Sequence, residues 1–149
     1  MRNEKIFELI TLITPTAAMA PDVHGGRAKC LQRLVRLDMP VPLTVALSFK
    51  AVHDIAIGQM PDMDALIAPF GENPLLSVRP SSQGPDWGGP SAILNVGMND
   101  VRHAIMVDDL GEAAATALYL RFVRSFAVHV SRLDPDAFDI PDNADRITL

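Results

Sequence analysis

The stretch of residues 73–100 constrains the fold more than any other part of the chain. It opens with a short apolar run at residues 75–78, which predicts a buried strand that ends at Arg79. Residues 80–91 follow, and their three Pro, three Gly and three Ser leave no hydrophobic periodicity, which predicts a loop. A second apolar run at residues 92–96 predicts another strand. Loops of this length inside a compact domain are uncommon and often serve as lids or binding loops.

The composition predicts a soluble globular domain. A chain of 149 residues suits one domain, which would bury about 68–70% of its unfolded surface. Apolar residues make up 48% and charged residues 21%, and no apolar run approaches the ~20 residues that cross a bilayer. The net charge of −5 and the dispersed basic residues argue against nucleic acid as a partner. A single cysteine, Cys30, excludes an internal disulfide and favours the cytoplasm.

The remaining apolar patterns predict a mixed α/β fold. Helices are expected from Gly25 to about residue 38, at 49–57 with Ser48 as cap, at 63–68, at 101–107 with Asn99–Asp100 as cap, and at 111–133. Residues 41–49 predict a strand, and residues 5–13 fit a helix or a strand. In the long last helix we expect an apolar stripe to face the core: Ala115, Leu118, Phe122, Phe126 and Val130. We expect the runs at 41–49, 75–78 and 92–96 to form one small sheet covered by helices.

Two features of the sequence could bind phosphate. Gly25 and Gly26 at a helix start would leave backbone N–H groups free, and Arg27 would add a full positive charge. The alternative is that Gly25 and Gly26 form only a turn before the helix and bind no anion. Arg79 lies where a predicted strand ends and a loop begins. The alternative to phosphate binding by Arg79 is a structural ion pair with Asp86 or Asp100.

Other chemistry has weaker support in the sequence. The four histidines, at positions 24, 53, 103 and 129, are widely spaced and are better explained as surface or core residues than as metal ligands. Ser81 and Ser82 could supply a nucleophile, but no general base is placed beside them by the sequence. Trp87 could stack on an aromatic ring or anchor the loop. We therefore assign no catalytic residue and no metal ligand from the sequence.

Ordered motifs in the chain resemble the N-terminal nucleotide-binding region of pyruvate phosphate dikinase. Residues 73–79 (NPLLSVR) and 93–100 (ILNVGMND) are similar to that family's N-P-L-L-x-S-V-R and L-N-L-G-L-N-D, and residues 77–100 align without a gap. Residues 25–31 (GGRAKCL) resemble its G-G-K-G-A-N-L, and residues 37–42 (LDMPVP) its L-G-L-P-V-P. Residues 119–123 resemble Y-R-R-F-I and residues 136–139 resemble D-x-F-E. The resemblance covers residues 25–139, between a divergent segment at 1–24 and a loose tail at 140–149.

This resemblance implies a first ATP-grasp subdomain that binds ATP, with magnesium as a possible cofactor. Arg27 stands at the family's phosphate-contacting lysine, and Arg79 stands at its phosphate-contacting arginine. Gly25 and Gly26 match the glycines of the helix start, Gly88 matches the glycine of a flexible loop that covers the phosphates, and Gly89 follows it.

The sequence also departs from the family. The family's S-G-A-R becomes Pro80-Ser81-Ser82-Gln83, so an arginine and a backbone N–H are lost from the loop. Residues that match the second ATP-grasp subdomain, the phosphohistidine domain and the pyruvate domain are not found in these 149 residues. We therefore expect a phosphate-binding half-site that is not catalytic alone. The alternatives are a degenerate interaction or regulatory module, working with a protein partner or as a homo-oligomer, or a fragment that needs a partner chain with the second half.

Overall fold

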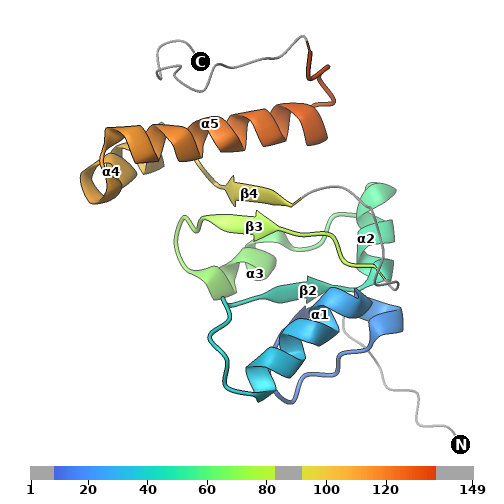
Figure 1. The fold of residues 1–149 in the computed structure, drawn as a ribbon. Coiled ribbons are helices and arrows are strands. Elements are labelled where there is room, and N and C mark those ends of the chain that lie inside the picture. The colour runs from blue at the N-terminus through green and yellow to red at the C-terminus, as the bar shows by residue number, and fades with distance from the viewer. Residues whose placement is uncertain (1–8, 83–91, 137–149) are drawn as a thin grey trace, which may run out of the picture. The chain divides into compact units, whose positions relative to one another are not determined.

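The fold is mixed α/β, with five α-helices and two small antiparallel sheets in the part of the chain that the computed structural model describes, residues 9–82 and 92–136. The elements follow one another as β1 (Ile10–Leu12), α1 (Pro21–Arg36), β2 (Val45–Leu47), α2 (Phe49–Ala56), α3 (Met63–Ile67), the 3-10 turn η1 (Ala68–Phe70), β3 (Leu76–Val78), β4 (Ile93–Val96), α4 (Asp100–Leu110) and α5 (Glu112–His129) (Figure 1). Because both sheets are antiparallel, the architecture is of the α+β type.

The chain divides into two compact units. The first unit contains Met1–Glu72 and Ser81–Gly88, and the second contains Asn73–Pro80 and Gly89–Leu149. The polypeptide therefore leaves the first unit before β3, returns to it at Ser81, and leaves it again before β4.

The first unit is built on the pair β1–β2 and helix α1. Ile10, Thr11 and Leu12 pair antiparallel with Leu47, Ala46 and Val45, respectively. The core beside this sheet is made of small and medium side chains: Ile13, Met19, Ala28 and Ala46, with Leu31 and Val35 packed against them. Helix α1 supplies Ala28, Leu31 and Val35 from one face, as the helical spacing of its apolar residues predicts.

A buried glutamine on α1 holds the connector between β1 and α1. The side chain of Gln32 is fully buried, and its Nε2 donates to the carbonyl oxygens of Thr14 at 3.0 Å and Ala17 at 2.7 Å. The Nζ of Lys29 donates to Gln32 Oε1 at 2.8 Å and to the carbonyl of Met19 at 2.9 Å. These bonds satisfy three backbone carbonyls of a segment that has no regular secondary structure of its own.

The second unit places β3 and β4 beside the pair α4–α5. Leu76 pairs with Val96 and Val78 with Ile93, with an irregularity between the two pairs. Helix α5 packs on both α4 and β4, and the imidazole Nε2 of His103 on α4 lies 3.0 Å from the hydroxyl of Thr116 on α5.

Gly97, just after β4, is held in a tight turn. Its φ is +104°, and a Cβ there would lie 2.5 Å from the carbonyl oxygen of Pro74. A larger residue at position 97 would push β4 away from the start of the β3 segment.

Several local predictions are confirmed. The hydroxyl of Ser48 accepts from the backbone N–H of Ala51 at 3.1 Å and caps α2, and Asn99 Oδ1 accepts from that of Arg102 at 2.9 Å and caps α4. The ambiguous run at residues 5–13 contains strand β1, and its residues 5–8 lie outside the described part of the chain.

Three expectations about the sheets and the core are wrong. The runs at 41–49, 75–78 and 92–96 do not share one sheet, because β2 pairs with β1 while β3 pairs with β4. The β3 strand is not buried, since Val78 at its end is 55% exposed. The apolar stripe of α5 faces the core only in its first half: Ala115 is fully buried, but Phe126 and Val130 are exposed. The side-chain hydrogen bonds of α5 to α4 and β4 at Thr116, Leu118 and Tyr119 lie in that first half, whereas in the second half Ala127, outside the predicted stripe, is the buried residue.

The Gln32 network yields a stability prediction. Gln32→Leu leaves the carbonyls of Thr14 and Ala17 and the ammonium of Lys29 without their buried partner, so we expect the free energy of unfolding to fall by about 2–4 kcal/mol. The measurement is urea denaturation followed by circular dichroism. The matched control, Gln59→Leu, makes the same substitution at an exposed position and should change the free energy of unfolding by no more than about 0.5 kcal/mol. Equal losses in the two variants would contradict the structural role of Gln32.

Candidate functional site

The candidate site begins at a kink in helix α1. Gly25 has φ 84° and ψ 161°, a backbone conformation open in practice only to glycine, and the helix continues from Gly26. Pro21 occupies the first turn of the helix before the kink. Residues 26–36 therefore form a helix with its own start, as the Gly-Gly pair predicts.

Ser81 packs directly against the missing side chain of Gly25. A Cβ on Gly25 would lie 2.8 Å from the Cβ of Ser81, closer than real Cβ contacts allow, and a tight 3.0 Å from its carbonyl carbon. The backbone N–H of Gly26 donates to the carbonyl of Ser82 at 2.7 Å. Within the first unit, the segment that follows Arg79 is thus fixed against the start of the 26–36 helix.

The hydroxyl of Ser81 is buried at this junction. Its Oγ has no hydrogen-bond partner among the described residues. A buried hydroxyl without a partner is uncommon in folded proteins, because burial removes its hydrogen bonds to water. The junction therefore holds one polar atom whose hydrogen bonds the described residues do not satisfy.

The two predicted arginines are both exposed. Arg27 lies in the first turn after the kink and has an interaction partner within the chain. Arg79 lies just after β3 and makes no hydrogen bond or ion pair with the described residues. The alternative ion pair with Asp100 is not formed, and Asp100 accepts from the hydroxyl of Tyr119 at 3.2 Å instead. Asp86, the other predicted partner, lies outside the described residues.

The expectation of free N–H groups at the Gly-Gly turn is wrong for Gly26. Its N–H is already bonded to the Ser82 carbonyl, a contact between residues 56 positions apart that no local pattern indicates. Gly25 itself is buried. Gly88 and Gly89, the predicted loop glycines, and Trp87 lie outside the described residues.

Two of the four histidines are buried and two are exposed. His24 and His103 are buried, the Nδ1 of His24 accepts from the N–H of Ala20 at 3.4 Å, and His53 and His129 are exposed. In residues 9–82 and 92–136, His, Cys, Asp and Glu side chains form no group of three or more that could hold a metal ion.

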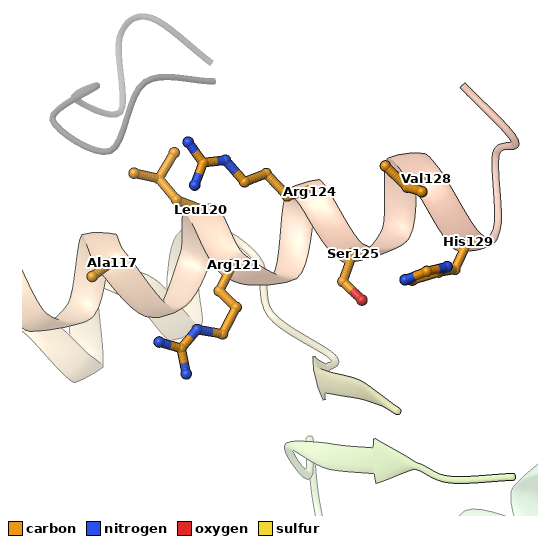
Figure 2. A pocket seen from close by; sticks show the side chains of 7 residues that line it. All are labelled: Ala117, Leu120, Arg121, Arg124, Ser125, Val128 and His129. Atoms are coloured by element: carbon orange, nitrogen blue, oxygen red, sulfur yellow. The ribbon is translucent and has the colours of Figure 1, made fainter. Parts of the chain in front are cut away.

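The sequence prediction missed a basic face on α5. A cavity of about 610 Å³ opens along this helix, and its described lining is Ala117, Leu120, Arg121, Arg124, Ser125, Val128 and His129 (Figure 2). Its volume falls within the range typical of ligand sites. The available signal was the polar spacing of Arg121, Arg124, Ser125 and His129, which repeats every three to four residues beside the apolar stripe.

Comparison with protein-family models gave no match, and comparison with curated proteins gave none either. None of the helices in the two described ranges has the length and apolar character that a membrane span requires.

The close approach at Gly25 can be tested against a second glycine with the same backbone strain. Gly25 and Gly58 both have positive φ, +84° and +88°, but a Cβ on Gly58 would meet nothing within 4 Å. We expect Gly25→Ala to lower the free energy of unfolding by about 1–3 kcal/mol more than Gly58→Ala, because only the former also displaces Ser81. Thermal and urea unfolding give the difference.

Hydrogen exchange provides an independent check of the same contact. The amide of Gly26 should exchange faster in Gly25→Ala, since displacing Ser81 also moves the carbonyl of Ser82. Equal destabilisation by the two alanines, with unchanged exchange at Gly26, would show that the packing of Ser81 on Gly25 is unimportant.

Proposed function

We propose that this chain is a nucleotide-binding module of the first ATP-grasp subdomain type, similar to the N-terminal region of pyruvate phosphate dikinase, and that it contacts the phosphates of ATP. The observation that carries the proposal is the packing of Ser81 and Ser82 on Gly25 and Gly26. It anchors the segment that follows the Arg79 motif in the sequence at the start of the Arg27 helix, and these are the two motifs that the resemblance assigns to phosphate binding.

The electrostatics of the helix start support an anionic ligand. The N-terminal end of a helix carries partial positive charge, and Arg27 adds a full charge within the first turn after the kink. Guanidinium groups can hold phosphate oxygens with two parallel hydrogen bonds. The buried hydroxyl of Ser81 provides a further donor beside Gly25.

Arg79 is the second cation of the proposal. It belongs to the second unit, but along the chain only Pro80 separates it from Ser81. Its guanidinium is exposed and makes no ion pair with the described residues, so no internal carboxylate in the described ranges competes with a phosphate for it.

The proposed role is binding rather than phosphoryl transfer by this chain alone. Phosphoryl transfer needs a metal that bridges the phosphates and groups that position the acceptor. In the proposal, the nucleotide arrives as its magnesium complex, and a partner chain with a second ATP-grasp half supplies the remaining contacts.

A second candidate function is that of an interaction module without nucleotide binding. The observation that favours it is the Gly26 N–H to Ser82 carbonyl bond, which puts a protein oxygen on a donor that a phosphate would otherwise use. Under this alternative, the junction at Gly25 serves only to fold the first unit. Nucleotide titration separates the two candidates.

Isothermal titration calorimetry with ATP, with and without magnesium, tests the proposal. We expect Arg27→Ala and Arg79→Ala each to weaken ATP binding by about tenfold or more, because each removes a charge-assisted hydrogen bond to phosphate. Arg33→Ala, which removes an equally exposed charge from the same helix as Arg27, is the matched control and should bind as the unsubstituted chain does. Absence of heat with ATP under both conditions would reject the proposal and favour the interaction module.

A further inference from the structure

The cavity along α5 has a lining of mixed basic and apolar character. Arg121, Arg124, Ser125 and His129 contribute hydrogen-bond donors, and Ala117, Leu120 and Val128 contribute apolar surface. No Asp or Glu is among its described lining residues. Basic groups therefore predominate among the charged side chains of the described lining, in a chain with a net charge of −5.

The arrangement of these side chains is elongated. From Ala117 to His129 the helix advances by about 18 Å, at 1.5 Å per residue. With about 100° between successive residues, Ala117, Arg121, Arg124 and Val128 point within about 60° of one another. Figure 2 shows the Arg121 and Arg124 side chains leaving the helix on opposite sides of this face, with Ser125 on the side of Arg121 and Leu120 on the side of Arg124. The two guanidinium groups therefore flank a narrow strip instead of converging on one point.

The spread of charge decides which ligand suits the face. A single small anion is held best when several donors converge on it, whereas two diverging arginines suit a ligand whose negative charges are spaced along its length. Apolar contacts between the two arginines suit apolar side chains placed between those charges. Both requirements are met by a polypeptide segment in which acidic and apolar residues alternate.

We propose that this face of α5 is a docking site for an acidic peptide segment of a partner protein. Arg121 and Arg124 pair with its carboxylates, Ser125 and His129 donate further hydrogen bonds, and Ala117 and Val128 contact its apolar side chains. Arg124 also has an interaction partner within the chain, so Arg121 is the more direct probe of docking. The inference uses none of the residues of the proposed phosphate site and stands independently of it.

Fluorescence anisotropy with the intact chain and a labelled synthetic peptide of about twelve residues tests the proposal. Its Asp and Glu residues alternate with Leu and Ala, and a neutral peptide with Asn and Gln in their place is the ligand control. We expect binding of the acidic peptide alone, weakened by raising salt from about 50 mM to about 300 mM because screening reduces charge pairing. Arg121→Gln should weaken binding about tenfold, and the double variant with Arg124→Gln should weaken it further.

Matched controls give each outcome one meaning. Arg33→Gln removes the same charge from α1 and should leave peptide binding unchanged. Arg27→Ala and Arg79→Ala should also leave peptide binding unchanged. In the reverse test, Arg121→Gln should leave ATP binding unchanged. Equal binding of the neutral peptide, or full binding by Arg121→Gln, would overturn the proposal. So would displacement of the peptide by inorganic pyrophosphate at equal concentration, because that result would identify the face as a small-anion site.

Discussion

The contact between Gly25 and Ser81 is the constraint on which the arrangement of the first unit depends. A residue with any side chain at position 25 would collide with the side chain of Ser81 and press closely on its carbonyl carbon, and the positive φ at position 25 would strain it further. The 2.7 Å bond from Gly26 to Ser82 then fixes the returning segment in register with the helix. Because the polypeptide re-enters the first unit only at Ser81, these two glycines determine where the segment after β3 is anchored.

The small apolar core of the first unit explains why polar contacts determine so much of its structure. Its buried apolar residues include Ala28, Ala46 and Ala51, and alanines remove little apolar area from water, so each contributes little transfer free energy. The fully buried Gln32 supplies some of the stabilisation that a larger apolar side chain supplies in other cores. Its hydrogen bonds are also directional, since its amide can donate only to carbonyls placed as those of Thr14 and Ala17 are. A network of this kind specifies one path for the connector, whereas apolar packing of small residues would tolerate several.

Sequence reasoning predicted the features that depend on neighbouring residues. The caps at Ser48 and Asn99, the helix start after Gly25 and the position of Arg79 at a strand end all follow from local chemistry, and the structure contains each of them, although helical residues from Pro21 also precede the kink at Gly25. The predicted strand pairing was wrong, because a run of three or four residues indicates extended backbone but does not indicate which strand it pairs with. The bond from Gly26 to Ser82 was missed for the same reason, since it joins segments far apart in the chain. The ATP-grasp assignment and the function of the arginines remain predictions.

The two proposed sites differ in the spacing of their positive charges, and this spacing, more than the total charge of the ligand, determines which ligand each site suits. A polyphosphate concentrates its negative charge within a few ångströms, so it favours a helix start where backbone dipoles and Arg27 act on the same volume. The α5 face spreads Arg121, Arg124 and His129 along about 12 Å of helix, which a compact anion cannot span. Net charge alone would repel both ligands from a chain at −5, so binding at either site depends on short-range hydrogen bonds that survive moderate screening better than long-range attraction does.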